Sequence, residues 1–209
     1  VNNRNYDFPA EWTKIRIKKR HISFAWGPTN DHVLKRVDRI EFTIASFVGG
    51  KGTVWIDSLG FEPLPPEAKS YPNPVADASS FSKNQSASLI TDGLPETFWH
   101  TCKTKGQNVV IDFKTRREFG GLEIDWQKGC YASKFDILIS EDKMKWEKVY
   151  AVQSNKNELS FVRLPETEAR YIKIELHDAA SSKGFGICEV KFLEVKNSLT
   201  KNDFFIFDN

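Results

Sequence analysis

The sequence is poor in methionine and cysteine, has no long apolar run and carries almost no net charge. One Met and three Cys among 209 residues exclude the dense disulfide framework of a small secreted domain. No segment approaches the roughly 18–20 consecutive apolar residues that a membrane helix needs. The 30 basic and 28 acidic residues leave a net charge of +2, which gives no electrostatic reason to expect nucleic-acid binding. We therefore expect no membrane span and no nucleic-acid partner.

Aromatic residues, in contrast, are abundant. The 16 Phe, 6 Trp and 5 Tyr make up 13% of the chain and favour sheet over helix. No helical periodicity continues over three turns. A length of 209 residues exceeds the usual single domain of about 100–150 residues, so two domains are expected.

Proline divides the sequence, because two Pro-rich stretches indicate a linker at residues 63–76. Before the linker, isoleucines alternate with basic residues at 14–18, which predicts a strand with a solvated basic face. A polyanion-binding face there is the alternative. Further strands are predicted at 39–47 and at 53–57, the second one entered by a glycine-rich turn.

After the linker, short segments alternate between apolar and polar residues. Ile172, Ile174 and Leu176 alternate with Lys173 and Glu175, as in a half-buried strand. The predicted strands are 109–113, 121–126, 135–140, 146–150, 159–164, 171–176 and 189–194. This many short strands with turns between them predict an antiparallel β-sandwich.

Four motifs in this second part carry a family resemblance. In order they are LITDGLPETFWHT at 89–101, SEDKMKW at 140–146, ARYIKI at 169–174 and GICEV at 186–190. With them, residues 77–197 resemble a discoidin domain, the coagulation factor V/VIII C-type module that also occurs as a galactose-binding-like carbohydrate-binding module. The resemblance implies an all-β jelly-roll sandwich. One departure is Lys143, which stands where the family usually has glycine in a turn.

Residues 1–62 resemble, more weakly, the C-terminal part of a second jelly-roll module found in glycan-active proteins. The resemblance is carried by Trp12, by AWGP at 25–28 and by GTVWIDSLGF at 52–61. We therefore expect a smaller, incomplete β-sandwich before the linker, a tail at 198–209 leading to a further module, and appended modules in the same polypeptide. An incomplete sandwich exposes a sheet edge, which predicts a homodimer through that edge.

The Asp-Gly-x-Pro-x-Thr turn at 92–97 resembles the turn that wraps a structural calcium ion in discoidin relatives. The resemblance implies ligation by the side chains of Asp92 and Glu189, by the hydroxyl and carbonyl of Thr97, and by the carbonyls of Leu89, Leu94 and Cys188. Calcium prefers six to eight oxygen ligands, which such a turn can supply. The alternative is an ordinary Asp-Gly turn whose side chains bond to the backbone.

The resemblance also implies a carbohydrate site at the loop end of the sandwich. Its candidate residues are His100, Trp126, Lys128, Tyr131 and Phe185. Phe185, with glycine on both sides, is the expected aromatic platform, whereas Trp126 fits the core equally well. His100 can contact sugar hydroxyls or be a surface histidine. Cys102 and Cys130 fall in the same loops, so a disulfide between them and free thiols both stay open, with free thiols favoured by the odd cysteine count.

The function that the resemblance implies is a non-catalytic carbohydrate-binding region. We expect it to target a larger extracytoplasmic, glycan-active protein to its glycan ligand. The alternatives are a protein- or phospholipid-binding discoidin domain and a structural spacer. The sequence contains no zinc-protease motif, nucleophile elbow or nucleotide loop, so we do not expect an enzyme.

Overall fold

The computed structural model describes residues 6–28, 30–45, 48–63 and 70–199. The chain forms two units, one of Val1–Glu67 with Lys201–Asn209 and one of Ala68–Thr200. Within the described ranges, no helix has the length and apolar character needed to cross a membrane. The predicted boundaries of the linker and of the tail stay predictions, and 64–69 and 200–209 lie outside the described residues.

The described part of residues 6–63 contains one short 3₁₀ helix, η1 (Lys19–His21), and no strand. The strands predicted at 14–18, 39–47 and 53–57 are therefore wrong for this part of the chain, with 46–47 outside it. The expected second jelly-roll module is not confirmed, and neither is the sheet edge for a homodimer. The physical reason is that isolated strands need neighbours to pair with and a second layer to cover their apolar face.

The aromatic residues that carried the weaker resemblance are exposed. Trp12, Trp26 and Trp55 keep 73%, 79% and 76% of their surface accessible. Their side chains therefore form no core among the described residues.

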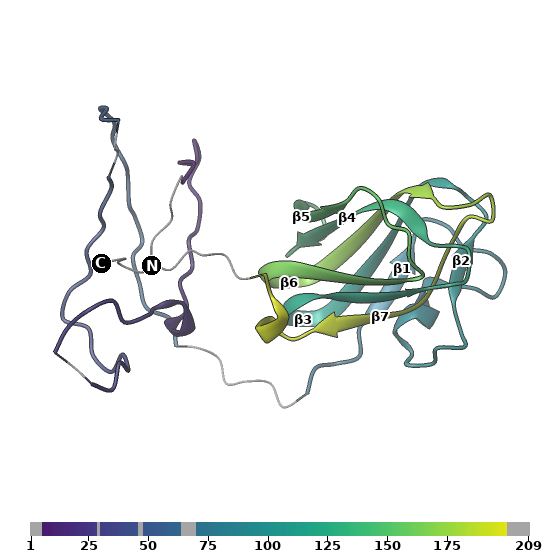
Figure 1. Ribbon diagram of the computed structural model, residues 1–209, viewed down its shortest axis with the longest axis horizontal. Coiled ribbons are helices and arrows are strands. Elements are labelled where there is room, and N and C mark those ends of the chain that lie inside the picture. The colour runs from purple at the N-terminus through teal and green to yellow at the C-terminus, as the bar shows by residue number, and fades with distance from the viewer. Residues whose placement is uncertain (1–5, 29, 46–47, 64–69, 200–209) are drawn as a thin grey trace. The chain divides into compact units, whose positions relative to one another are not determined.

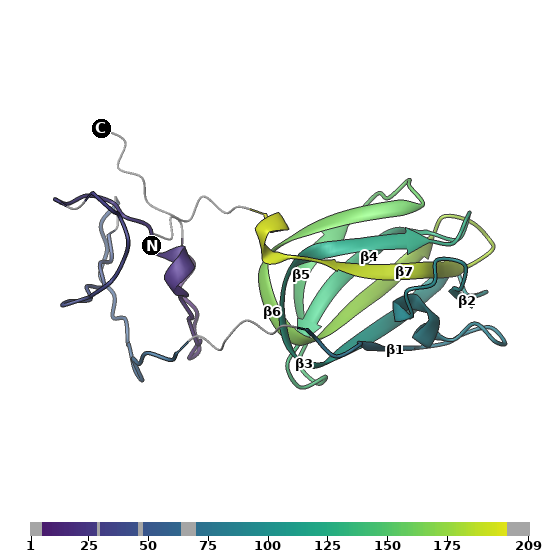
Figure 2. The same cartoon turned by 90° about the horizontal axis from the view of Figure 1, so that it is seen from below.

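The second unit is an antiparallel β structure (Figure 1). Its strands are β1 (Val75–Ala78), β2 (Trp99–Thr101), β3 (Lys105–Trp126), β4 (Ala132–Ser140), β5 (Glu147–Val152), β6 (Leu159–Ala179) and β7 (Phe185–Leu193). They are ordered β2-β7-β3-β6-β4-β5, and β1 pairs with β3. Two 3₁₀ helices, η2 (Ala87–Thr91) and η3 (Val195–Asn197), complete it. Helix η2 lies beside β1 and β2 (Figure 2).

Two long strands, β3 and β6, join the layers of the sandwich. Residues 105–112 of β3 pair with 171–178 of β6, and 117–125 pair with 159–169, with a register shift between. The first half of β3 also pairs with β1 and the second half with β7. The sequence predicted two strands in each case, because the polar residues between them are typical of turns. A bulge turns the corner without ending the strand.

The core confirms the predicted alternation. Ile172, Ile174 and Leu176 are fully buried. Trp126 packs edge-to-face on Phe135, with ring centroids 5.4 Å apart. Burying each such side chain contributes roughly 1.5–3 kcal/mol, so the aromatic content of this unit stabilises the sandwich. The all-β antiparallel fold is thus confirmed for the second unit.

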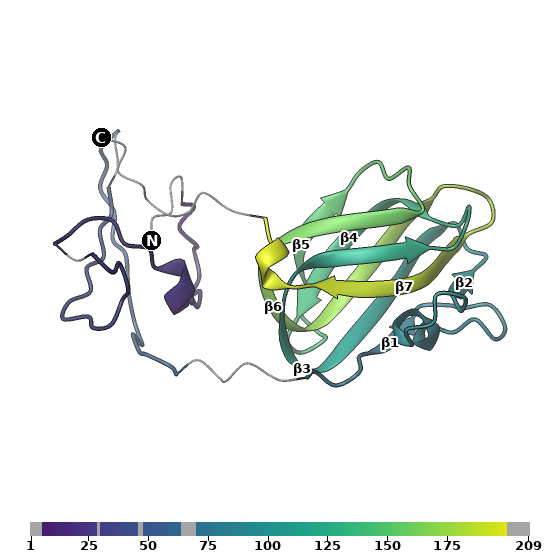
Figure 3. The ribbon, with the colours of Figure 1, turned by 60° about the horizontal axis from the view of Figure 1, so that its bottom comes forward.

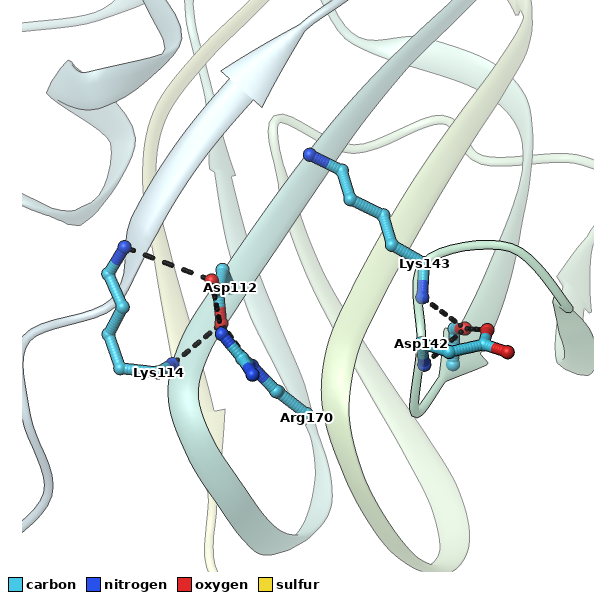
Figure 4. A network of polar contacts seen from close by, with 6 residues as sticks. Asp112, Lys114, Asp142, Lys143 and Arg170 are labelled. Carbon is cyan, nitrogen blue, oxygen red and sulfur yellow. Dashed lines mark hydrogen bonds and ion pairs between the residues drawn. The ribbon is translucent and has the colours of Figure 1, made fainter.

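Asp112 is fixed by charge at the bend of β3 (Figure 4). It accepts hydrogen bonds from Arg170 Nε at 3.1 Å and from the Lys114 backbone N–H at 2.7 Å. Burial raises the pKa of Asp112, but the hydrogen bonds and charges of Arg170 and Lys114 outweigh it and leave the pKa below its usual range. The ion pair therefore ties β3 to β6 at the bend.

The turn after β4 contains the family departure at Lys143 (Figure 4). Asp142 Oδ1 accepts the backbone N–H groups of Met144 and Lys145 at 2.8 and 2.9 Å. Ser140 Oγ accepts the Lys143 N–H at 2.9 Å. Lys143 has φ +66°, the left-handed conformation that favours glycine. The turn therefore contains a residue with a strained backbone.

Candidate functional site

Loops converge around β2 at one end of the sandwich, where the segment joining β6 to β7 lies beside β2 (Figures 1 and 3). Strand alternation buries Trp99 and Thr101 and leaves the intervening His100 half-buried at the surface. Trp99 is fixed by its Nε1–H, which donates to the Ser80 carbonyl at 3.0 Å. We call this region, formed by residues 80–84, 100–104, 127–131 and 181–184, the loop-end surface.

His100 joins two of these loops. Its Nε2 lies 3.0 Å from the Lys183 carbonyl oxygen, and its Nδ1 lies 3.1 Å from Ser82 Oγ. A carbonyl oxygen only accepts, so Nε2 donates to it, and in the neutral ring Nδ1 accepts from the hydroxyl. Both ring nitrogens are thus engaged. His100 fixes the loops that carry Ser82 and Lys183, and its direct contact with a sugar stays a prediction.

Gly184 permits this arrangement. It has φ +93°, and a Cβ at this position would lie 2.0 Å from the Thr101 carbonyl oxygen. Any side chain would therefore push the Lys183–Gly184 segment away from β2. The contact between His100 and Lys183 depends on this glycine.

The structure corrects the expected aromatic platform. Phe185 is fully buried, because it begins β7 opposite Thr101 and points into the core. Trp126 is 2% exposed, and its Nε1–H donates to Ser160 Oγ at 2.8 Å. Neither ring can face a ligand, so the prediction for Phe185 is wrong and the core alternative for Trp126 is confirmed. Gly184 instead permits close approach of the Thr101 backbone, and Gly186 leaves room for the side chain of Gln127.

Phe81 is the exposed aromatic residue that the sequence analysis missed. It is 59% exposed and directly precedes Ser82, whose hydroxyl contacts His100. A signal for it existed, because Phe81 stands alone among turn-forming polar residues, with no strand alternation to bury it.

Lysines surround this surface. Lys83, Lys103, Lys128 and Lys183 are exposed, and no ion pair joins their side chains to described residues. Lys183 Nζ lies 3.7 Å from where a Cβ of Gly129 would stand, so it reaches the loop of Lys128. Basic side chains therefore outnumber acidic ones at this surface.

Two acidic residues near these loops already have partners. Asp178 pairs with Lys105 and Lys134 at 3.8 and 3.7 Å. Glu158 Oε1 accepts the Gly129 N–H at 2.8 Å.

Tyr131 packs partly against the core, and its carbonyl oxygen accepts the Ala180 N–H at 2.9 Å. Its role toward a ligand stays a prediction.

All three cysteines are free thiols, so no Cys102–Cys130 disulfide forms. Cys102 is exposed, and its Sγ lies 3.7 Å from Ser82 Oγ. Burial raises the pKa of both Cys130 and Cys188. These two thiols therefore stay protonated at neutral pH.

The predicted cation turn brings oxygen atoms together around Thr97. Its hydroxyl oxygen lies 2.8 Å from Asp92 Oδ2, 2.9 Å from the Leu94 carbonyl oxygen and 3.4 Å from the Leu89 carbonyl oxygen. One hydroxyl proton cannot serve three acceptors well. Oxygens that converge without enough protons are the donor set that a calcium ion prefers.

Glu189 connects this turn to β7. Its Oε2 accepts the Gly93 N–H at 3.2 Å, and its side chain is largely buried. Burial raises the pKa of Glu189, and the negative charges of Asp92 and Asp125 raise it further, against the opposing effects of Gly93 and Lys191. A divalent cation would relieve this excess of negative charge. The residues present therefore fit calcium. Ligation by the Cys188 carbonyl oxygen stays a prediction.

Another cluster of metal-ligating types lies on β4 and β6, where donor atoms of Asp136, Glu175 and His177 come within 4.8 Å of one another. Asp136 already contacts Lys148 Nζ at 2.6 Å and His177 Nε2 at 3.0 Å. Burial raises the pKa of Asp136, but these two partners outweigh it and lower the pKa overall. Its charge is thus neutralised within the sheet face.

Comparison with known proteins decides the family. The family model of the F5/8 type C domain matches residues 75–190, more than half of the chain. The chain belongs to this family. No curated protein matches the sequence.

Solved structures share the fold of the F5/8 type C domain. Chitosan-binding module 2 of a chitosanase/glucanase from Paenibacillus sp. IK-5, in complex with chitotriose, is 19% identical with a TM-score of 0.54, covering 58% of this chain and 96% of that one. The family 32 CBM of Clostridium perfringens NanJ, in complex with galactose, is 20% identical with a TM-score of 0.52, covering 57% and 93%. The CBM32 of AlyQ, in complex with 4,5-unsaturated mannuronic acid, is 24% identical with a TM-score of 0.50, covering 57% and 93%.

Proposed function

We propose that the F5/8 type C domain is a non-catalytic carbohydrate-binding module with its ligand at the loop-end surface. The observation that carries the proposal is the exposed side chain of Phe81 on the segment that His100 fixes through Ser82, together with the exposed lysines of the same surface. Sugar recognition combines an apolar face for the C–H side of the ring with a few positioned polar groups. The shared fold with carbohydrate-binding modules supports the same interpretation.

The lysines indicate the class of glycan. Exposed Lys128 and Lys183, with Lys83 and Lys103 near them, favour a ligand with carboxylate or sulfate groups. Each charge pair in a water-exposed setting contributes about 1 kcal/mol. Chitosan, whose amino groups are positively charged, fits this surface poorly. The module of AlyQ in complex with 4,5-unsaturated mannuronic acid and a pectin-binding module of similar fold are the better guide.

The cation site supports this surface from the neighbouring turn. We infer a structural calcium ion bound by Asp92, Thr97 and Glu189 with carbonyl oxygens of the turn. The ion would neutralise the negative charges of Asp92 on the turn and Glu189 on β7, and its role is not catalytic. Its role is to stiffen the end of the sandwich that carries the loops.

The wider role that we propose is targeting. Weak binding by this domain raises the local concentration of appended modules on a polymer, and tandem modules add avidity. We propose that the chain is part of a larger, extracytoplasmic, glycan-active protein.

A second candidate function shares the same chemistry. Phe81 and the lysines also suit an anionic phospholipid surface, since an exposed apolar ring can insert while lysines contact headgroups. The single exposed aromatic at this end and its fixed neighbours Ser82 and His100 favour the carbohydrate.

The test is a glycan array with the full chain in calcium, followed by calorimetric titration of oligogalacturonate and oligomannuronate. Phe81→Ala should lower the affinity for an acidic glycan at least about tenfold, because the stacking face is lost. Lys145→Ala, an exposed lysine in the turn after β4, is the matched control and should bind normally. Absence of acidic-glycan binding, together with binding to phosphatidylserine vesicles that Phe81→Ala abolishes, would assign the phospholipid function instead.

A further inference from the structure

A depression opens on the side of the sandwich, where β5 and the first half of β6 form neighbouring edges of the two layers. Among the described residues, β5 pairs with β4 alone and residues 159–163 pair with β3 alone. The depression has a volume of about 390 Å³, within the range of small-ligand sites. We call it the lateral groove. It shares no residue with the loop-end surface.

Exposed rings and a buried floor form the apolar part of the groove. Phe161 is 63% exposed and Tyr150 37%, while Phe135 is fully buried at the core side. Leu159, 42% exposed, lies on the same strand as Phe161. Most of the other aromatic residues in the strands are buried, so these exposed rings stand out, and they offer faces for stacking.

The polar part of the groove is a fixed loop with spare hydrogen-bonding groups. Asn155 Nδ2 donates to the Ala132 carbonyl at 3.0 Å and to the Asn157 carbonyl at 3.1 Å, and Asn155 Oδ1 accepts the Asn157 N–H at 3.1 Å. This locks the loop onto β4. The side-chain amide of Asn157 and the hydroxyl of Ser154, in contrast, make no hydrogen bond with a described residue. Both therefore remain available to a ligand.

Charge is absent from the lining of the groove. None of its described lining residues is Asp, Glu, Lys or Arg, although 28% of the chain is charged. Aromatic faces, an amide and a hydroxyl without charge match the C–H faces and hydroxyls of an uncharged sugar. We propose that the lateral groove binds a neutral sugar unit of an oligosaccharide, as a second carbohydrate site. This extends the proposed function without depending on an acidic ligand at the loop end.

A strand of another chain fits the groove less well. Strand addition needs a regular free edge, and the pairing of β4 with β5 shifts register between Ile137 and Leu138. A stable protein interface also needs roughly 800 Å² on each partner, more than this small depression offers. The uncharged, compact shape therefore favours a sugar.

The test uses the full chain and two matched variants. Phe161→Ala and Phe81→Ala remove similarly exposed rings, 63% and 59%, from the groove and from the loop end. Cellotetraose, mannotetraose and β-1,4-galactotetraose are titrated into each by calorimetry. One of them should bind, with Phe161→Ala lowering its affinity at least about tenfold and Phe81→Ala leaving it unchanged. Asn157 is exposed, and Asn157→Ala should also weaken binding of the same tetrasaccharide.

Three results would overturn the groove assignment. Binding lost in Phe81→Ala and kept in Phe161→Ala would move the neutral sugar to the loop end and leave the proposed function standing. Failure of all three tetrasaccharides to bind, while an acidic glycan still binds, would remove the second site alone. Self-association in sedimentation that Phe161→Ala abolishes would assign the groove to a second copy of the chain.

Discussion

The loop-end surface and the lateral groove present similar aromatic rings in opposite electrostatic settings. Phe81 and Phe161 are 59% and 63% exposed. Lysines surround the first, whereas no charged residue lines the groove beside the second among the residues described. The difference teaches that two rings with similar exposed fractions can have different surroundings. Under the proposed assignments, the charge around the ring selects an acidic ligand at the loop end and a neutral one in the groove.

The two surfaces also differ in how they are built. The loop end depends on contacts between loops, such as His100 with Lys183, and on the left-handed backbone of Gly184. The groove rests on paired strands and on the locked Asn155 turn. A single backbone change should therefore break the first and spare the second.

Gly184→Ala is expected to have the largest effect. Its methyl group would clash with the Thr101 carbonyl oxygen, because a Cβ at position 184 would lie only 2.0 Å from that atom. We expect the free energy of unfolding to fall by about 3 kcal/mol or more, measured by urea denaturation. At temperatures where the variant is folded, acidic-glycan binding should be lost and neutral-glycan binding kept. A change in stability below about 0.5 kcal/mol would refute the packing described here.

The next largest expected effect is the stabilisation of the chain by calcium, which depends on Glu189. Calcium at about 100 times its Kd should stabilise the chain by about 2.7 kcal/mol, and chelation should remove this. Glu189→Gln should abolish most of the calcium effect, measured by thermal unfolding with and without the ion. Equal stabilisation of both proteins would exclude Glu189 as a ligand.

The sign of the pH dependence follows from the raised pKa of Glu189. Without calcium, the unfolded chain ionises this carboxyl first, so stability falls as pH rises from the ordinary glutamate range through the raised folded pKa. Glu189→Gln should remove this part of the slope and be the more stable protein at neutral pH in chelator. A wild-type contribution that rises with pH over this range would contradict the raised pKa.

Lysine replacement sharpens the electrostatic half of the comparison. The double variant Lys128→Gln with Lys183→Gln should lower acidic-glycan affinity about tenfold. The remaining affinity should depend less on salt, since two exposed charges are gone. Calorimetry at two ionic strengths measures both. Equal losses for acidic and neutral glycans would show that the lysines do not discriminate.

The sequence was sufficient to predict the sandwich. Apolar residues at every second position, such as Ile172, Ile174 and Leu176, can all be buried together in a strand with one face on the core, and they are. It could not predict that β3 and β6 run unbroken through the bend, since a bulge preserves pairing where polar residues suggest a turn.

The prediction of the aromatic platform failed in a different way. Phe185 and Phe81 both lie near small or polar residues, and only the pairing of β7 with β2 decides that the first is buried. The exposure of the Phe161 ring could not be predicted from the sequence either, because it depends on which strand lies at an edge of the sheet. Asp92 and Glu189, which the resemblance implies as cation ligands, lie close enough for their negative charges to interact, while their ligation of calcium stays a prediction.

Lys143→Gly should give the smallest effect and serve as a control for both surfaces. Glycine relieves the left-handed strain at φ +66°, so we expect stabilisation of about 1 kcal/mol or less. Urea denaturation measures it, and affinity for both glycans should be unchanged. Destabilisation would mean that the Lys143 side chain has a role beyond this turn.

The most direct measurement is amide chemical-shift mapping of the ¹⁵N-labelled full chain titrated with an acidic tetrasaccharide in calcium. The account predicts shifts at residues 81–84, 100–104, 127–131 and 181–184, where the loop-end surface lies. Shifts confined to other parts of the domain, or none at saturating glycan, would contradict carbohydrate binding at this surface.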